Sequence, residues 1–340
     1  MVVEKYDVAV VGAGPGGLKA AETLAKNGKK VIVLEKNSIV GPKVCAGGLT
    51  TKDESLIDKS IIQRSFDSVV VRSKRQSIVI RDKKPFVYTT SRKDFGQWQL
   101  KQAEKAGAEV RVNSNVTKLK ENSVFADGNE IAFDCLIGAD GSNSIVRKFL
   151  GLGNEKTHMA IQYIIRGRFN DMEIIFDADK FGYGYAWVFP YKNYASIGCG
   201  MDLRHMKTSV LKQNFHRWLD ERKIDYAGAR FEAFLINYDF RGFEFGNKFL
   251  IGDAAGFTSG LSGEGIYSAM LSGDEVAKKI INNDYDCEKL NGYLKIKNLH
   301  EKILGFMERH RKMLKINQEI GIFLLRSDFI AKKAISLVTG

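Results

Sequence analysis

The chain has 340 residues, of which 44% are hydrophobic, and it contains 33 glycines but 4 prolines. That composition excludes collagen-like, disulfide-scaffold and disordered proteins, and the length is typical of about two domains. The 52 Lys and Arg outnumber the 40 Asp and Glu, so the formal net charge is +12. A basic excess of this size favours an anionic partner, such as a nucleic acid, a phosphorylated small molecule or a membrane.

The cysteines and the N-terminal residues indicate the cellular setting. The cysteines at positions 45, 135, 199 and 287 form no CxxC or Cys/His cluster. We therefore expect reduced thiols, with neither a zinc site nor an iron–sulfur cluster. Residues 1–14 lack the basic segment and cleavage site of a signal peptide, and no apolar run approaches the roughly 18 residues of a membrane span. These features predict a cytoplasmic protein.

A glycine-rich turn lies between two predicted strands near the N-terminus. Residues 6–12 predict a buried strand, residues 18–27 a helix and residues 30–35 a second strand. A dinucleotide-binding fingerprint requires this order of strand, glycine turn, helix and strand. The turn contains Gly12, Gly14, Gly16 and Gly17.

Each part of that turn has a predicted role in binding a dinucleotide. Gly12 permits the tight turn, and Gly14 lets the backbone approach a pyrophosphate at the helix N-terminus. Gly17 allows the helix to pack closely on the strand, and Glu35 is placed to accept a hydrogen bond from a ribose hydroxyl. The structural alternative is a glycine-rich turn in an α/β domain without a ligand.

Two further predicted strands end in glycine-rich turns. The first covers residues 133–138 and leads into the Asp140-Gly141 turn, with Ser144 as a predicted helix N-cap. The second covers residues 248–252 and is also followed by a glycine-rich segment. Asp140 is more typical of a turn than of a ligand contact.

The segment after the last of these strands predicts contacts to a flavin. Asp253 lies at the strand end, where a carboxylate can hold a ribityl hydroxyl. A helix is predicted over residues 265–281. The backbone N–H groups of Gly265 and Ile266 at its start can face the electron-rich edge of a flavin ring.

Three such elements in this order resemble the FAD-dependent superfamily of aromatic hydroxylases, halogenases and geranylgeranyl reductases, over residues 5–283. The resemblance implies FAD as the cofactor and an α/β fold with a Rossmann-like FAD-binding domain. It also implies an inserted, mostly antiparallel β-sheet substrate domain and a short helical C-terminal tail. The implied ranges are 1–64, 92–152 and 244–283 for the FAD-binding domain, 65–91 and 153–243 for the substrate domain, and 284–340 for the C-terminal helices.

The same resemblance implies further contacts to FAD. Arg92 opens a predicted helix at a position where relatives contact FAD, and Val116 lies where they make a backbone contact to adenine. Cys45, Ala46 and Gly48 belong to a loop that resembles the relatives' cysteine-and-glycine loop beside the flavin. A solvated arginine and an ordinary surface loop are the alternatives.

Two motifs narrow the resemblance to the geranylgeranyl reductase family, in particular to its archaeal digeranylgeranylglycerophospholipid reductases. The first is YxWxFP, with Tyr185, Trp187, Phe189 and Pro190, and the second is LSGEGIYSAM at residues 261–270. In a strand, the three aromatic residues project to one face. They are suited to form the apolar wall of a pocket for a polyprenyl chain, and the alternative is a core strand.

The resemblance implies a reductase that saturates isoprenoid C=C bonds of geranylgeranyl chains, in archaeal-type membrane lipid precursors or a related prenyl substrate. Hydride would come from N5 of the reduced flavin. Cys45 is a candidate for proton handling or redox gating, and a packing role is its alternative. Because there is one complete GxGxxG, the electron donor is expected to dock transiently, as NAD(P)H or as a carrier protein.

Several other functions are alternatives to this one. An FAD-dependent monooxygenase or halogenase would use the same fold, although Tyr185 and Phe189 depart from the halogenases' WxWxIP pattern. A quinone reductase of the electron-transfer-flavoprotein type usually carries a four-cysteine cluster. A non-catalytic flavin- or lipid-binding carrier is a further alternative. We expect no nucleic-acid partner, because basic residues are not interleaved with stacking aromatics in a known module.

The C-terminal segment carries much of the basic excess. Residues 295–340 contain ten Lys and Arg against four acidic residues, a net charge of +6, and an apolar patch at residues 320–325. Two helices are predicted here, over residues 290–313 and 316–337. Basic and apolar residues together predict peripheral docking on an anionic membrane surface, on the inner face of the cell membrane. A solvated helical face is the alternative.

Overall fold

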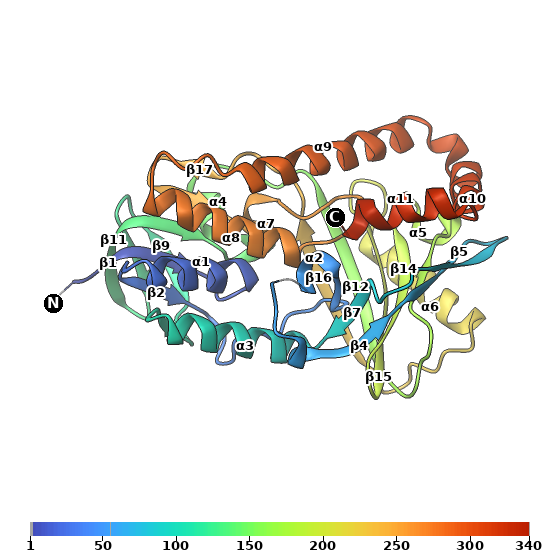
Figure 1. The fold of residues 1–340 in the computed structure, drawn as a ribbon, viewed down its shortest axis with the longest axis horizontal. Helices are drawn as coiled ribbons and strands as arrows, with labels where there is room; N and C mark the ends of the chain where they lie inside the picture. The colour runs from blue at the N-terminus through green and yellow to red at the C-terminus, as the bar shows by residue number, and fades with distance from the viewer. Residues whose placement is uncertain (1–2, 55, 340) are drawn as a thin grey trace. The chain divides into compact units, whose positions relative to one another are not determined.

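The structure is a computed structural model that describes residues 3–54 and 56–339, the last three of these by their backbone. The chain divides into two compact units, each with its own sheet (Figure 1). The first unit comprises Met1–Lys43, Arg92–Lys156 and Ile236–His300, and the second comprises Val44–Ser91, Thr157–Leu235 and Glu301–Gly340.

The first unit is built on a largely parallel sheet. Its strands are β1 (Glu4–Val11), β2 (Val31–Leu34), β8 (Glu109–Arg111), β9 (Val116–Leu119), β10 (Ser123–Ala126), β11 (Asn129–Gly138), β17 (Glu244–Phe245) and β18 (Lys248–Leu250). Their order is β17-β18-β11-β1-β2-β8, with β10 and β9 attached beside β11. The pairs β18–β11, β11–β1, β1–β2 and β2–β8 are parallel. The central strands are apolar and buried, as expected for a parallel sheet covered on both faces.

Helices of the first unit pack closely where glycines replace larger residues. These helices are α1 (Pro15–Lys26), α3 (Arg92–Lys105), α4 (Ile145–Phe149), α7 (Gly252–Ala255) and α8 (Ile266–Ile281). α1 packs against both α3 and α8 (Figure 1). A Cβ on Gly16 would lie 2.7 Å from the carbonyl oxygen of Ala269, so this glycine allows α1 and α8 to approach.

The second unit contains a mostly antiparallel sheet. Its strands are β5 (Ser68–Arg72), β6 (Ser77–Arg81), β12 (Thr157–Arg166), β13 (Glu173–Ile175), β14 (Tyr185–Pro190), β15 (Tyr194–Asp202) and β16 (Arg230–Asn237), in the order β16-β12-β15-β14-β13-β5-β6. β12, β15, β14 and β13 pair in antiparallel succession, and β13 pairs in parallel with β5. A small sheet of β3 (Gly48–Thr50), β7 (Val87–Thr90) and β4 (Ile62–Phe66) completes this unit, with the short helices α2 (Thr51–Glu54) and α5 (Ala178–Phe181).

The two faces of β14 have different neighbours. Ala186 and Val188 are buried in a core cluster that includes residues of α6 (Thr208–Glu221). The three aromatic residues of the strand alternate with them and therefore project to the opposite face. The prediction that these aromatics share one face is confirmed.

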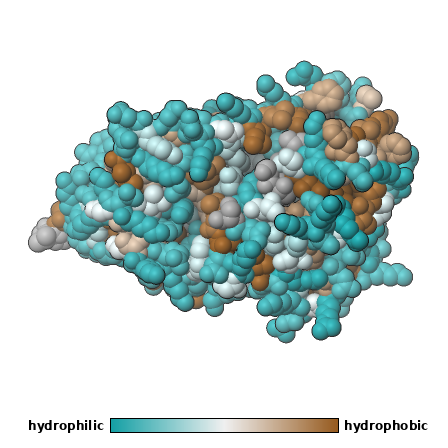
Figure 2. Space-filling model, viewed as in Figure 1, coloured by the Kyte–Doolittle hydropathy of each residue, from teal (hydrophilic) through white to brown (hydrophobic). Residues whose placement is uncertain are grey.

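The C-terminal helices are α9 (Glu288–Arg309), α10 (Leu314–Leu324) and α11 (Asp328–Thr339). The prediction of one helix over residues 316–337 is wrong, because the chain turns between α10 and α11. Ile322 and Ile335 contact the same apolar cluster, whereas a straight helix would separate them by roughly 20 Å. Figure 2 shows apolar side chains, in brown, gathered over α10 and α11.

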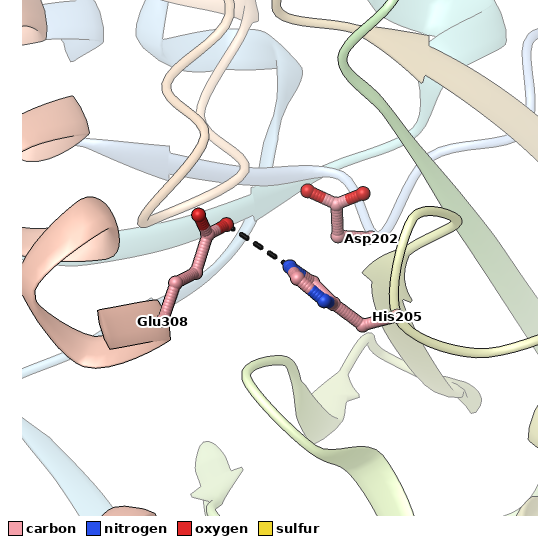
Figure 3. Close-up of side chains that lie close together, drawn as sticks. All are labelled: Asp202, His205 and Glu308. Carbon is pink, nitrogen blue, oxygen red and sulfur yellow. Dashed lines mark hydrogen bonds and ion pairs between the residues drawn. The ribbon is translucent and has the colours of Figure 1, made fainter. Parts of the chain in front are cut away.

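Asp202, His205 and Glu308 bring three potential metal-ligand atoms within 4.8 Å of one another in the second unit (Figure 3). His205 Nε2 lies 3.0 Å from a carboxylate oxygen of Glu308. The guanidinium of Arg204 donates to both acids, at 2.6 Å to Asp202 and 2.7 Å to Glu308. Because Arg204 pairs with both carboxylates, the cluster forms an ion-pair network that ties the end of α9 to the segment after β15.

The predicted fold class is confirmed, with an α/β first unit, a mostly antiparallel sheet in the second unit and C-terminal helices. Within the part of the chain that the structure describes, no helix combines the length and apolar character needed to cross a bilayer.

Candidate functional site

The three predicted turns lie at the carboxyl ends of three neighbouring parallel strands, β1, β11 and β18. Backbone hydrogen bonds continue from the strands into the turns. Ala139 N donates to Val11 O at 2.8 Å, and Ile251 N donates to Gly138 O at 3.0 Å. Ligands of open α/β sheets bind outside the carboxyl ends of the strands. The topology therefore brings together, at one edge of a sheet, motifs that are far apart in the sequence.

In the first turn, the backbone at Gly12 is packed against the protein, whereas the backbone at Gly14 has free space beside it. Gly12 has φ +101°, and a Cβ on it would lie 2.6 Å from the carbonyl oxygen of Ala139. A Cβ on Gly14 would instead have a single neighbour, at 3.8 Å. α1 starts after Gly14 without a side-chain cap, so its first N–H groups are available to an anion.

Glu35, 9% exposed, holds the turn in shape. Its carboxylate accepts from Ala13 N at 2.9 Å, and also from the backbone N and the side-chain amide of Asn37, at 2.9 and 2.6 Å. The same carboxylate has lone pairs left to accept from a hydroxyl, and its contact with a ribose stays a prediction. Its hydrogen bond to the turn itself is a role that spacing alone did not suggest.

Arg92 is the first residue of α3, as predicted. Its Nε and Nη1 atoms are buried and make no hydrogen bond to the described residues, while the ring of Phe95 lies 5.2 Å from the guanidinium. Buried N–H groups of an arginine are costly unless an acceptor meets them. This side chain is therefore suited to an acceptor on a ligand. Val116 opens β9, as predicted.

Asp253 is held in place by neighbouring side chains, independently of any ligand. Its carboxylate accepts from Lys43 Nζ at 3.0 Å and from Thr258 Oγ1 at 2.6 Å. Gly265 packs against the hydroxyl of Thr258, since a Cβ on this glycine would lie 2.6 Å from Thr258 Oγ1. α8 then begins at Ile266 without a side-chain cap, leaving N–H groups at its start.

One face of α9 holds the loop that leads to α8. Tyr293 Oη donates to Phe257 O at 2.8 Å, and Lys297 Nζ donates to Thr258 O at 3.0 Å. His300 Nδ1 lies 2.8 Å from Ser259 Oγ. Three side chains spaced four and three residues apart on the helix thus bind three successive residues of the loop. By sequence, Lys297 is one of the cations of the basic C-terminal segment, and this role was not predicted.

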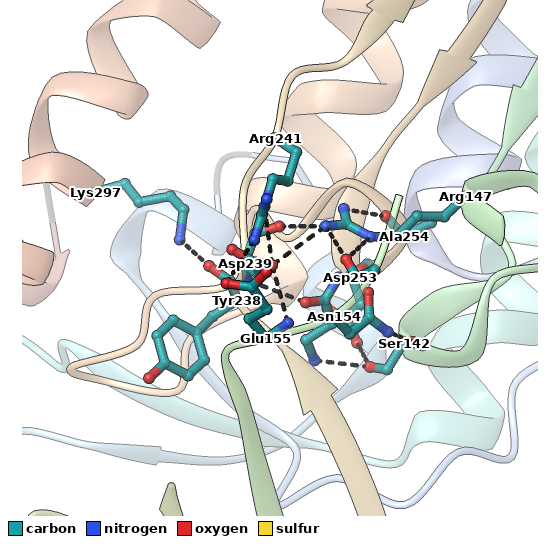
Figure 4. Close-up of polar contacts among 12 residues, drawn as sticks. Ser142, Arg147, Asn154, Glu155, Tyr238, Asp239, Arg241, Asp253, Ala254 and Lys297 are labelled. Carbon is teal, nitrogen blue, oxygen red and sulfur yellow. Dashed lines mark hydrogen bonds and ion pairs between the residues drawn. The ribbon is translucent and has the colours of Figure 1, made fainter. Parts of the chain in front are cut away.

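Arg147 links the second and third turns (Figure 4). It is fully buried, and its guanidinium donates to the carbonyl oxygens of Gly153, Asp239 and Ala254 at 2.8 to 3.1 Å. Burial lowers the pKa of this guanidinium, which the nearby Asp239 opposes. Ser144 caps α4 through Arg147 N, as predicted.

Asp140 acts within its own turn. Its carboxylate accepts from Ile145 N at 2.6 Å, and burial raises its pKa. This contact within the turn agrees with the interpretation of Asp140 as a turn residue.

The segment 45–48 packs closely against side chains of the second unit. A Cβ on Gly48 would lie 2.5 Å from the ring of Phe189. Tyr191 Oη donates to Ala46 O at 2.7 Å. Close packing therefore requires a glycine at position 48 independently of any flavin.

The aromatic residues of β14 form a continuous row. The ring centroids of Tyr185 and Trp187 are 6.1 Å apart, and those of Trp187 and Phe189 are 6.4 Å apart. Gly198 of β15 makes room for the indole, since any Cβ there would collide with it. Trp187 is buried, whereas Tyr185 and Phe189 are half-buried, and Pro190 ends the strand. The row presents apolar ring area on one face of the sheet.

A row of polar side chains crosses four adjacent strands on this face. Trp187 Nε1 donates to Ser196 Oγ at 3.0 Å, and Ser196 Oγ donates to Gln162 Oε1 at 2.8 Å. Gln162 Nε2 donates to Glu232 Oε2 at 2.6 Å and to Cys45 O at 3.3 Å. The row fixes the indole and the Cys45 loop in one network. It was not predicted, because it depends on strand register.

The residues of the first unit fit FAD. Buried Arg92 nitrogens, room beside Gly14 and two helix starts without side-chain caps suit a ligand with phosphates and a polar ring. Asp253 and Glu35 supply carboxylates that can accept hydrogen bonds from hydroxyls of such a ligand. The individual contacts to FAD stay predictions.

Comparisons with known proteins agree with this fit. The FAD binding domain family matches residues 5–283. Digeranylgeranylglycerophospholipid reductase 3 of Methanosphaera stadtmanae is 29% identical, over 86% of this chain and 82% of that protein. A geranylgeranyl diphosphate reductase of Rhodobacter capsulatus is 28% identical, over 98% of this chain and 88% of that protein.

Among solved structures, a geranylgeranyl bacteriochlorophyll reductase-like protein of Thermoplasma acidophilum shares the fold, with a TM-score of 0.74 at 24% identity. The match covers 99% of this chain and 92% of that one. These comparisons confirm the predicted resemblance and FAD as the cofactor.

Proposed function

We propose that this chain, which belongs to the FAD binding domain family and is an FAD-dependent oxidoreductase, saturates C=C bonds of geranylgeranyl chains. The main support is the extent of the similarity. Two relatives named for reducing a geranylgeranyl compound match 86% and 98% of this chain. The substrate is a prenyl lipid or prenyl diphosphate of that class.

The first unit holds the cofactor in this proposal. N–H groups at the starts of α1 and α8, with Arg92, bind the phosphates and the polar ring edge. Glu35 and Asp253 accept hydrogen bonds from its hydroxyls. When bound and reduced, FAD supplies the hydride. The electron donor is NAD(P)H or a carrier protein.

The aromatic row of the second unit binds the prenyl chain. An isolated alkene has no carbonyl to polarise, so positive charge develops on its more substituted carbon as a proton adds to the other. The faces of Tyr185, Trp187 and Phe189 stabilise that charge by about 1–2 kcal/mol when water is excluded. Ser196 keeps the indole fixed, which limits the reorganisation needed during the reaction.

Cys45 is the proposed group for proton handling. Its Sγ accepts a hydrogen bond from Gly47 N at 3.3 Å, so the sulfur has a fixed position in the loop. We expect Cys45→Ser to lower the anaerobic rate by about tenfold or more, consistent with loss of an acid–base group. Cys135→Ser is the control, because Cys135 lies on β11 in the first unit. Full activity of Cys45→Ser would remove Cys45 from the mechanism.

The proposed function is tested by the mass of the product. Dithionite-reduced protein is incubated without oxygen with a digeranylgeranylglycerophospholipid or with geranylgeranyl diphosphate, and the lipid is analysed by mass spectrometry. We expect a gain of one H2 for each double bond reduced. No gain with either compound would overturn the proposal, and a hydroxylated or halogenated product under oxygen would favour the monooxygenase alternative.

A further inference from the structure

α10 exposes an apolar stripe on one face. Ile316, Ile320, Phe323 and Leu324 follow helical spacing and are 46–58% exposed. Residues at positions i, i+4, i+7 and i+8 of a helix lie on one side. Figure 2 shows brown side chains over this part of the second unit. Side chains of this size are usually buried, and a contiguous exposed group of them marks a contact surface.

The opposite side of α10 is already fixed to the second unit. Ile322 is buried in the cluster that includes residues of β5 and β6. Glu319 accepts from Ser73 Oγ and from Gln76 Nε2, both at 2.8 Å, and Gln318 Nε2 donates to Gly182 O at 3.2 Å. The exposed stripe is therefore a second apolar face on a helix whose first face is packed.

Exposed cations precede and follow the stripe along the chain. Between residues 309 and 333, seven Lys and Arg stand against two acidic residues, and all seven cations are exposed. The Arg326 guanidinium lies 5.4 Å from the ring centroid of Phe323, and Lys333 Nζ lies 5.4 Å from that of Phe329, which is 71% exposed. Of the two acids, Glu319 is occupied by the hydrogen bonds described above. The electrostatic partner of this face is therefore negative.

We propose that the exposed face of α10, with the cations beside it, docks on the surface of an anionic lipid bilayer. An apolar stripe flanked by Lys and Arg inserts among acyl chains while the cations meet phosphate headgroups. A second copy of this chain does not match the charge, because it would bring the same cations face to face. The proposal rests on this surface alone and does not depend on the proposed reaction.

The proposal is tested by co-sedimentation of the FAD-loaded full chain with vesicles. We expect retention on vesicles that contain phosphatidylglycerol and little retention on pure phosphatidylcholine. The double variant Ile320→Glu/Phe323→Glu is expected to bind about hundredfold more weakly. Lys332→Ala/Lys333→Ala is expected to bind about 25-fold more weakly, since each cation near the surface is worth about fivefold.

Val210→Glu is the matched control, because Val210 is an exposed apolar residue on helix α6 of the same unit. It is expected to bind like the unchanged protein. Circular dichroism and flavin absorption confirm that each variant is folded and loaded. Wild-type retention of the Ile320→Glu/Phe323→Glu variant would overturn the proposal. A concentration-dependent dimer that this variant abolishes, without vesicle binding by the unchanged protein, would also overturn it in favour of self-association.

Discussion

Two groups of cations in this chain have opposite surroundings. In the first unit, Arg147 and Lys297 are almost fully buried, and their charged groups donate to backbone carbonyl oxygens of separate segments. In the second unit, Arg326, Lys332 and Lys333 are exposed beside an apolar face. The first group crosslinks the loops of the cofactor unit, whereas the second group remains available to a partner. The cations of this protein therefore have two separate roles.

Arg147→Met is expected to have the largest effect on stability. It would leave the carbonyl groups of Gly153, Asp239 and Ala254 buried without this donor and the Asp239 carboxylate with one fewer cation. We expect a loss of about 4 kcal/mol in the free energy of unfolding, measured with urea. The control is Lys148→Met, at the exposed neighbouring position. A loss below about 1 kcal/mol would remove Arg147 from the group of crosslinking cations.

Lys297→Met is expected to have the second-largest effect on stability. The carbonyl oxygens of Tyr238 and Thr258 would each lose a donor, at an expected cost of about 3 kcal/mol. The loop before α8 would also loosen, so we expect weaker FAD binding in a fluorescence titration. Lys295→Met, exposed on the same helix, is the matched control. Equal FAD affinity in the two variants would contradict the role of Lys297 in holding the loop.

Glu173 tests whether buried polar contacts of the second unit also stabilise the fold, here through an ion pair with Arg72 and Arg222. Burial raises the pKa of Glu173, but Arg222 and Arg72, through hydrogen bonds and charge, outweigh it and lower the pKa below its usual 4.5. The stabilisation is therefore complete above the unfolded pKa and is lost as the pH falls through the folded pKa.

Glu173→Gln should remove this dependence. We expect about 2 kcal/mol less stability than the unchanged protein at neutral pH, and a smaller difference in acid. Urea unfolding as a function of pH measures both curves. Parallel curves for the two proteins would show that the pKa of Glu173 is the same in the folded and unfolded states.

Lys332→Ala/Lys333→Ala is expected to have the smallest effect on stability. Because both side chains are exposed, we expect the free energy of unfolding to stay within about 0.5 kcal/mol of the unchanged protein. The same variant is expected to bind vesicles about 25-fold more weakly. A large loss of stability would mean that these cations, too, act as internal crosslinks.

Local patterns in the sequence predict the first unit well. The apolar runs of β1, β11 and β18 and the glycines that follow them are adjacent in the sequence, so their turns can be recognised directly. The meeting of these turns at one sheet edge follows from parallel pairing. The alternation of aromatic residues along β14 likewise predicts their common face.

Contacts between distant residues could not be predicted from the same patterns. Lys297 bonds to residues 59 and 39 positions away, so its burial depends on how α9 packs. The polar row from Trp187 to Glu232 depends on the register of four strands, which a single sequence does not specify. The turn between α10 and α11 arises because both helices pack on one apolar cluster.

Anaerobic reoxidation of the flavin would show directly whether this protein reduces a geranylgeranyl lipid. The reduced protein is mixed with a geranylgeranyl lipid in the absence of oxygen, and the visible absorption of the flavin is followed while the lipid is sampled. We expect the oxidised flavin spectrum to return, with one flavin reoxidised for each double bond lost. A flavin that stays reduced with the lipid and reoxidises after oxygen is admitted would contradict it.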